Sequence, residues 1–444
     1  MFSVLTPKLV TTQILKSLCC VSFWIKMNRL DKKLTIASAS QNLDTKSEKV
    51  VHRFIPMLVA ENMTRVSEYE SGKAVPRVDL WNCIGMRMDK AFQNQREHSS
   101  RMDFSSALLK DKYAMLEELG VPREGRDVIR DDDDSTKTWL KHRIKQLVSS
   151  GTVYVEPTMV NICDDCGYLQ SVQGSPTSSC TLCEGKDFHH EKKEVLMIDI
   201  PENRNSLTKG RIIHPRNSKH IQSFFEQMPP KMMISKVREY GLPLDPIGLP
   251  EYVLDPKIGV ALMPELVTER NGLSEVTLVQ GAAVAINALP YTSIMTSGFQ
   301  HTYVLLPKIP PTTLEDARNI GLSFMGRHLP FILMEHNGDL TPAQFKTAQE
   351  EYSRIMWKID KTLFELRSEK RGMPVDLRLE DHQMLSEIAR DFDRYDIRDG
   401  RRKLNRFFKN QGRKCAEELR KNGDYLSPKD VDTLEGVVKL FYRV

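Results

Sequence analysis

The sequence predicts an α/β protein whose parallel sheet is split by a zinc-binding insertion and followed by an all-helical domain. Three observations support this fold class. A strand, a helix and a second strand follow one another near the amino end, two Cys-x-x-Cys pairs interrupt the α/β region, and the chain from Thr312 to Val444 has mostly helical periodicity. Alternating strands and helices are typical of a parallel sheet with helices on its faces. The 444 residues suffice for two or three domains.

The amino-terminal part of the chain has the pattern of one βαβ unit. The apolar segment at 34–39 is the first predicted strand. Apolar residues at helical spacing between Val51 and Val66 predict the helix, and residues 74–78 are the next predicted strand. Strands joined in this way pair in parallel.

An acidic run, Asp131 to Asp134, precedes a helix predicted over 138–148. Carboxylates in front of a helix complement its dipole, and Ser135 is the predicted N-cap. A metal site is the alternative use of such a run. The sequence favours the capping interpretation.

After the insertion, strands are predicted at 231–235 and 275–281, and a helix at 282–296. Helices are then predicted at 313–327, 342–368, 380–394, 401–421 and 428–442. The expected domains are a disordered leader (1–30), a first α/β half (31–150), a zinc-knuckle insertion (151–200), a second α/β half (201–312) and a helical domain (313–444).

Four cysteines form the strongest local motif, and they are Cys163, Cys166, Cys180 and Cys183. Two turns that each present two thiolates supply the four soft ligands of a tetrahedral structural zinc. Four free thiols in a loop are the alternative. The other cysteines are scattered, which indicates a reducing compartment and not a disulfide framework. The cytoplasm is therefore expected, or an organelle if residues 1–26 are a presequence.

The distribution of charge and of apolar residues indicates which kinds of partner the chain can bind. The net charge is only +5, but residues 401–421 hold nine Lys or Arg against two Glu. This segment, which contains Phe407 and Phe408, is a candidate polyanion-binding surface or a solvated helix face. No segment has the roughly 20 apolar residues of a membrane helix. Residues 1–26 are moderately apolar and contain no acidic residue. The alternatives for this segment are a weak signal peptide, an organellar presequence and an upstream start before Met27. A disordered or mis-assigned leader is favoured.

Several local matches lie between Lys33 and Arg420 in one order. They are Arg65 with Gly72–Val75, Trp81–Met86, the run from Tyr113 to Gly151, Ile234–Pro243, Gln280–Gly281, and Asp316–Phe331 followed by Leu340–Phe345. Together with the cysteine knuckle, these segments resemble the class I aminoacyl-tRNA synthetases of the methionyl, leucyl and valyl branch, and the methionyl enzymes most.

The resemblance implies a split Rossmann-like sheet of the HUP type, a zinc-knuckle insertion and a helical bundle that resembles an anticodon-binding domain. It implies ATP-dependent activation of an amino acid and transfer to tRNA or another acceptor. Structural Zn²⁺ and ATP are the implied cofactors. An amino acid and tRNA or another RNA are the implied partners.

Both ATP signatures of the family depart from its pattern here. The first, His-Ile-Gly-His, aligns with residues 50–53 and leaves His52 with Arg53 as a possible phosphate partner. The second, Lys-Met-Ser-Lys-Ser, falls in 304–312, where Lys308 is basic and three prolines stiffen the loop. His52, Arg53 and Lys308 are thus the candidate catalytic residues.

Other positions of the resemblance give candidate cofactor-binding residues. Gln280 and Gly281 match the strand end that meets the adenosine ribose, and Asn287 stands where methionyl enzymes have His. Lys236 and Arg238 are possible substitute phosphate donors.

Four interpretations follow. The chain is a divergent active synthetase, a catalytically inactive pseudo-synthetase that binds RNA or a protein partner, a paralogue in the synthesis of amino-acid-derived metabolites, or an unrelated zinc-containing α/β protein. Losing one preorganised contact typically lowers a rate about 10²–10³-fold, so losing most of two signatures should cripple the ordinary reaction.

Overall fold

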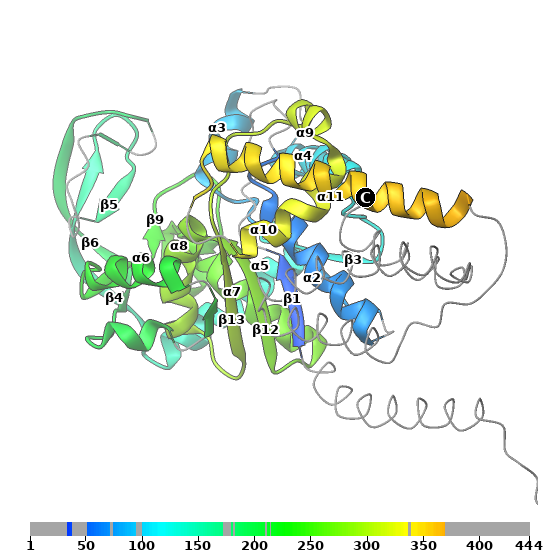
Figure 1. Ribbon diagram of the computed structural model, residues 1–444. Helices are drawn as coiled ribbons and strands as arrows, with labels where there is room; N and C mark the ends of the chain where they lie inside the picture. Colours follow the sequence, from blue (N-terminus) through cyan, green and yellow to red (C-terminus); the bar gives the residue numbers. More distant parts are fainter. Residues whose placement is uncertain are drawn as a thin grey trace, which may run out of the picture.

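Six parallel strands form the central sheet, in the order β3-β2-β1-β12-β13-β7 (Figure 1). The strands are β1 (Lys33–Ala37), β2 (Arg77–Trp81), β3 (Arg126–Arg130), β7 (Arg211–Ile213), β12 (Glu275–Gly281) and β13 (Gln300–Leu306). The computed structural model describes residues 33–37, 51–71, 74–94, 100–171, 179–180, 183–208, 211–213, 215–335 and 339–368.

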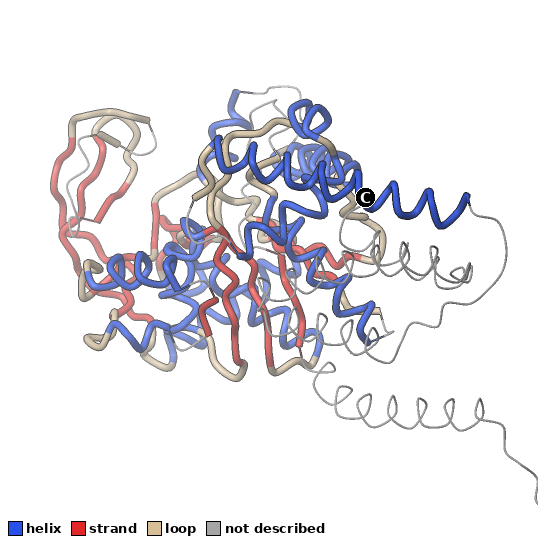
Figure 2. The backbone as a smooth tube through the Cα atoms, viewed as in Figure 1, coloured by secondary structure: helices blue, strands red, loops and turns tan. Residues whose placement is uncertain are grey.

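The sheet is assembled from two separate parts of the chain. Strand β1 pairs with β12, so that Leu34 lies opposite Val276, and the strands run side by side through the body (Figure 2). This arrangement confirms the predicted split parallel sheet. Strand β2 begins later than the predicted 74–78 because Val75 N donates to Glu68 Oε1 at 3.0 Å, and Pro76 has no N–H for the sheet.

Helices cover both faces of the sheet, as expected for parallel strands. One apolar cluster includes α2 (Ile55–Ser71), α3 (Met86–Asn94) and α4 (Arg101–Glu118), and the other includes α5 (Asp134–Ser149), α6 (Pro215–Glu226), α7 (Pro256–Asn271) and α8 (Ala282–Met295). Alternate side chains of β13 separate the clusters, since Val304 and Leu306 join the first, and Tyr303 and Leu305 the second. Both faces of the sheet are therefore core.

A long antiparallel hairpin projects from this body (Figure 1). Its strands are β4 (Val153–Cys163) and β6 (Phe188–Asp199), which are flanked by β5 (Leu169–Ser171) and β8 (Lys231–Met233). A small sheet beside it contains β9 (Ser235–Lys236), β10 (Pro243–Leu244) and β11 (Leu249–Leu254), and short helical turns are η1 (Arg204–Thr208) and η2 (Asp245–Ile247). The cysteine motif lies at the tip of the hairpin.

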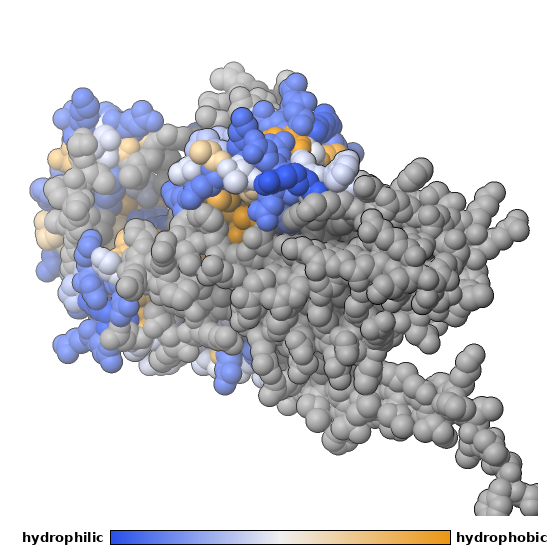
Figure 3. Space-filling view, in the orientation of Figure 1, coloured by the Kyte–Doolittle hydropathy of each residue, from blue (hydrophilic) through white to orange (hydrophobic). Residues whose placement is uncertain are grey.

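The carboxyl-terminal described part is helical. It contains α9 (Leu314–Ile320), the π-helix η3 (Phe324–His328), α10 (Leu329–Glu335) and α11 (Pro342–Ser368). The predicted helix 342–368 is confirmed, whereas the single predicted helix 313–327 is wrong, because Gly321 (φ +116°) interrupts it. The described surface at the top of Figure 3 is mainly hydrophilic. No described helix has the length and apolarity to cross a membrane.

Several sequence predictions fall on other parts of the chain. The leader (1–30), the predicted helices at 380–394, 401–421 and 428–442, and Phe407 and Phe408 lie outside the described residues.

A buried ion network fixes α2 against β2 and β3. The Glu61 carboxylate is fully buried and accepts from Arg126 Nη1 at 2.7 Å, Arg65 Nε at 2.7 Å and Arg77 Nε at 3.1 Å. Arg126 also pairs with Asp79 at 2.7 Å. Burial alone would raise the pKa of Glu61, but Arg126 and Arg77 outweigh burial and hold this pKa below its usual range. One carboxylate thus neutralises parts of three arginines.

His301 lies near the start of β13 and is only 8% exposed. Neither ring nitrogen has a hydrogen-bond partner among the described residues, and the ring packs against Tyr303 with centroids 5.0 Å apart. Burial lowers the pKa of His301 from 6.5 to about 4. The native protein therefore holds this imidazole neutral.

Stability is expected to fall in mild acid because of His301. The unfolded chain protonates this imidazole near pH 6.5 and the folded chain near pH 4. The stabilisation is therefore complete above pH 6.5 and declines as the pH falls, by about 3 kcal/mol once the pH is below 4. Denaturant unfolding between pH 7 and 4 should show this slope in wild type and less of it in His301→Phe. The exposed His142→Gln serves as control, and an unchanged slope in His301→Phe contradicts the assignment.

Candidate functional site

The four motif cysteines converge at the hairpin tip. Their sulfur atoms all lie within 4.8 Å of one another, with Cys163 Sγ 3.5 Å from Cys183 Sγ and Cys166 Sγ 3.7 Å from Cys180 Sγ. A tetrahedral Zn²⁺ with Zn–S bonds of about 2.3 Å separates its sulfur ligands by about 3.8 Å. The sulfur arrangement is thus compatible with structural zinc.

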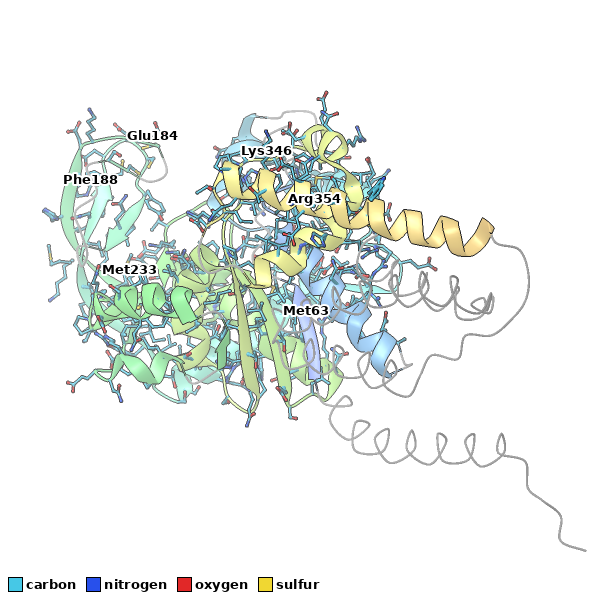
Figure 4. All side chains as sticks on the ribbon, viewed as in Figure 1. Met63, Glu184, Phe188, Met233, Lys346 and Arg354 are labelled. Carbon is cyan, nitrogen blue, oxygen red and sulfur yellow. The ribbon has the colours of Figure 1, made fainter. Side chains whose placement is uncertain are left out.

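The two Cys-x-x-Cys turns have the same backbone conformation. In one, Gly167 N donates to Cys163 O at 2.8 Å, and in the other, Glu184 N donates to Cys180 O at 2.9 Å. Both residues have φ of +68°, and Glu184 has the only positive φ of a described non-glycine residue. Figure 4 places Glu184 and Phe188 at the outer end of the hairpin, far from Met63 of α2. The knuckle is therefore separate from the sheet edge where strands end.

The predicted remnant of the first ATP signature lies directly before α2. There, Val51 N donates to Thr312 O at 2.8 Å, and Thr312 N donates to His52 Nδ1 at 3.0 Å. The structure thus brings His52 together with the loop that should hold the second signature. His52 Nδ1 is an acceptor in this contact, so a neutral ring carries its proton on Nε2. Arg53 is exposed.

Lys308 lies in the same loop, and its backbone is tied elsewhere. Lys308 N donates to Asp339 Oδ1 at 2.8 Å, and Leu340 N donates to Lys308 O at 2.9 Å. The residue is exposed. The loop 307–313 is therefore anchored at one end on α2 and at the other on the segment before α11.

The predicted nucleotide residues of β12 and α8 occupy different environments. Gln280 is 1% exposed at the end of β12, and Gly281 is the N-cap residue of α8. Asn287 is exposed further along this helix. Gln280 is thus the only one of the three whose side chain is buried at the carboxyl edge of the sheet.

A second cluster lies where β2 and β3 end, in the acidic run for which the sequence analysis gave a metal site only as the alternative and did not include Cys83. Cys83, Asp131 and Asp132 are 0%, 0% and 3% exposed, and one ligand atom from each lies within 4.8 Å of the others. Burial and the neighbouring Asp132 raise the pKa of Asp131 to about 8. Burial, followed by the charges of Asp131 and Asp132, raises the pKa of the Cys83 thiol well above its usual value.

The prediction that Ser135 is the N-cap residue is wrong, whereas acidic residues do stand at the start of the helix, as expected. Helix α5 begins at Asp134, its N-cap residue Asp133 makes no side-chain capping bond, and Ser135 lies inside the first turn. Asp131 Oδ1 accepts from Cys83 N at 2.5 Å and from Ile84 N at 3.1 Å. The signal was present in the sequence, because the run directly follows a strand whose carboxyl end faces the ligand edge of a parallel sheet.

Two arginines fix the segment after β2. Arg101 Nη2 donates to Cys83 O at 2.7 Å, Arg238 Nη2 donates to Ile84 O at 2.8 Å, and both guanidinium groups pair with Asp89. Lys236 Nζ lies 3.8 Å from Asp255 and 5.7 Å from the Tyr168 ring centre. Asp89 and Asp255 thus already pair with the two predicted substitute phosphate donors.

Several buried polar atoms near the strand ends have no hydrogen-bond partner among the described residues. They are Asn82 Oδ1, Asp131 Oδ2, Arg238 Nε and Nη1, and Gln280 Oε1. Buried polar atoms are nearly always hydrogen-bonded in native proteins, so such a group of exceptions marks a place for water, an ion or a ligand. The carboxyl edge of the sheet is therefore the second candidate site.

Comparisons with known proteins agree with this layout. No family model and no curated protein matches the chain by sequence. Among solved structures, the methionyl-tRNA synthetase of Mycobacterium tuberculosis bound by methionyl-adenylate is similar over 92% of this chain and 88% of its own, with 10% identity and a TM-score of 0.63. The LeuRS of Agrobacterium radiobacter K84, in a ternary complex with tRNA and LeuAMS, is similar over 92% and 83%, with 9% identity and a TM-score of 0.64.

Identity this low speaks for the fold alone. The parallel sheet split by a hairpin insertion, the cysteine knuckle and the following helices all have the order predicted from the sequence. The resemblance is thereby confirmed, and the chain has the fold of the class I aminoacyl-tRNA synthetases, as methionyl and leucyl members display it.

Proposed function

We propose that this chain is a synthetase-like protein that binds tRNA or a similarly folded RNA and does not form an aminoacyl-adenylate by the class I reaction. The contact between Thr312 and the start of α2 is the observation that supports this most strongly. Class I chemistry needs hydrogen-bond donors and positive charge around the transferring phosphates. Here the backbone N–H groups of Val51 and His52, directly before α2, already donate to Thr312 O.

The acceptor position in front of α2 is filled by a neutral backbone carbonyl. Thr312 O accepts from Val51 N at 2.8 Å and from His52 N at 3.4 Å, and Thr312 is only 4% exposed. Pro56 occupies the second residue of α2 and removes one more N–H that a phosphate oxygen would use. These features favour loss of adenylation over slow adenylation.

RNA binding rests on what the chain keeps. The similarity covers 83% of the LeuRS that is solved with tRNA. The segment 401–421 adds a local charge of nine basic against two acidic residues. A basic stripe of this density is an electrostatic footprint for nucleic acid. We assign the helical domain, predicted at 313–444, to RNA contact and the knuckle to structural zinc.

Pyrophosphate exchange with each of the twenty amino acids tests the missing activity. The full chain, purified with zinc, is expected to give no exchange above a no-enzyme background. Exchange supported by any amino acid overturns this part of the proposal. In that case His52, Arg53 and Lys308 are the residues to replace first, with Gln280, Gly281 and Asn287 as nucleotide contacts.

A gel shift with total tRNA tests the binding part. Glu in place of Arg402, Arg406, Lys409 and Arg413 is expected to abolish the shift at 150 mM salt, and to reduce the slope of log affinity against log salt by about 0.7–0.9 per lost contact. The matched control reverses four exposed lysines outside the helical domain, Lys110, Lys145, Lys192 and Lys257. Equal loss in both variants, or none in the first, contradicts the assignment of 401–421.

A further inference from the structure

The cluster of Cys83, Asp131 and Asp132 is unexplained by the synthetase-like fold and by the proposed function. Cys83 follows β2, and the two aspartates follow β3, so the topology brings the ends of neighbouring parallel strands together. The three side chains are 0–3% exposed and their ligand atoms lie within 4.8 Å of one another. Two carboxyl groups and a thiol therefore share one dry space.

Both carboxylates are held by neighbours, which leave Asp131 Oδ2 without a donor and Asp132 Oδ1 with a single donor, Arg130 Nε, among the described residues. Asp131 Oδ1 accepts from the backbone N–H groups of Cys83 and Ile84, at 2.5 and 3.1 Å. Asp132 is held by Arg130, whose Nε and Nη2 donate at 2.7 and 2.8 Å, and by Ser105 Oγ at 2.6 Å. Hydrogen bonds that orient a carboxylate in this way are typical of the surroundings of metal ligands.

A second observation points to a ligand. Asp131 is fully buried, and its Oδ2 atom has no hydrogen-bond partner among the described residues. An acceptor oxygen without a donor in a dry site calls for a cation or a proton. The thiol beside it distinguishes among cations, because Mg²⁺ and Ca²⁺ prefer oxygen ligands only and Zn²⁺ accepts sulfur and oxygen together.

We propose that Cys83, Asp131 and Asp132 form a second divalent-metal site, of the Zn²⁺ class, separate from the cysteine knuckle. Ligand atoms around Zn²⁺ lie about 3.3–3.8 Å apart. Three ligand atoms that already lie within 4.8 Å of one another reach this spacing through small side-chain movements. The Cys83 thiol and the Asp131 carboxyl group, whose pKa burial raises, both lose their protons on binding, and the two protons leave to solvent. The metal would join the ends of β2 and β3 at the carboxyl edge of the sheet.

Metal content of the full-length protein tests the proposal. After dialysis against zinc-free buffer, wild type is expected to retain two equivalents of zinc. The double variant Cys166→Ser/Cys183→Ser should retain one equivalent, from the cluster, and Cys83→Ser should retain one, from the knuckle. Cys415→Ser is the matched cysteine control and should retain two. Ser105→Ala should weaken zinc affinity at the cluster of Cys83, Asp131 and Asp132 about 10–100-fold and leave zinc affinity at the cysteine knuckle unchanged.

Cadmium substitution gives a readout that does not depend on how the variants fold. Wild type loaded with ¹¹³Cd²⁺ should show two resonances, one from the four-sulfur site and one from a site with one sulfur and oxygens. Cys166 and Cys183 are exposed, whereas Cys83 is buried. A chelator should therefore remove the knuckle metal first. A single equivalent and a single resonance in wild type overturn the proposal, as do two equivalents in folded Cys83→Ser. A proton on Asp131 then takes the place of the cation.

Discussion

Replacing Glu61 by Gln is expected to lower the free energy of unfolding of the α/β body by about 3–5 kcal/mol. The change keeps the shape of the side chain and removes its charge. Arg126 is 2% exposed and Arg77 16% exposed, so both guanidinium groups would lose a buried counter-charge at 2.7 and 3.1 Å. Urea unfolding followed by tryptophan fluorescence measures the loss.

The expected loss depends on pH in a defined direction. Because the folded pKa of Glu61 lies below the unfolded value of 4.5, its stabilisation is present above pH 4.5 and disappears as the pH falls through the folded pKa. Wild type and Glu61→Gln should therefore differ most near neutral pH and converge in acid.

A matched surface variant separates burial from charge. Glu118 pairs with Arg318 at 2.8 Å, but these side chains are 34% and 53% exposed. Glu118→Gln should cost less than about 1 kcal/mol, as is usual for exposed pairs. A similar loss of unfolding free energy in both variants would show that burial does not strengthen the contribution of the Glu61 ion pairs to stability.

Removing the zinc proposed for the knuckle, by chelation or by Cys180→Ser, is expected to abolish the order of the hairpin tip while the parallel sheet stays folded. Structural zinc contributes about 10–16 kcal/mol of apparent binding free energy in small zinc domains. The apolar cluster at the tip contains only Cys163, Tyr168 and Cys180, with Phe188 packed against it. That cluster is too small to hold two turns with φ of +68° in place.

Hydrogen exchange measured by mass spectrometry locates the effect. Peptides from 163–171 and 183–190 should lose protection on chelation, and peptides from β12 and β13 should keep it. Cys415→Ser is the cysteine control and should behave as wild type. Unchanged protection at the tip after the metal has left would argue that the hairpin holds the knuckle without it.

The sequence predicted the features whose determinants lie close together in the chain. The Cys-x-x-Cys spacing fixes two tight turns whatever surrounds them, and the sulfur atoms do converge as predicted. Periodicity located α8 and α11 nearly to the residue, because each is a continuous stretch of one pattern. The order of these elements, together with the local matches between Lys33 and Arg420, carried the resemblance to the class I synthetases.

The predicted boundaries of helices and strands were wrong where a single side chain or a single backbone turn sets the end of the element. The Glu68 contact with Val75 N delays β2, and Gly321 divides the helix predicted at 313–327. Neither effect changes the spacing of apolar residues, so a prediction based on hydrophobic periodicity alone does not detect it.

What the sequence alone determined is the scaffold: a split α/β sheet, a four-cysteine knuckle inserted in it and helices after it. Only the tertiary structure decided how the strand ends are used. Thr312 meets His52, Asp131 meets Cys83 and Glu61 meets Arg126 across long separations in the chain. The reason is physical. Local spacing fixes turns and helices through covalent geometry, whereas the partner of a buried charge or a free N–H is set by which segments pack together.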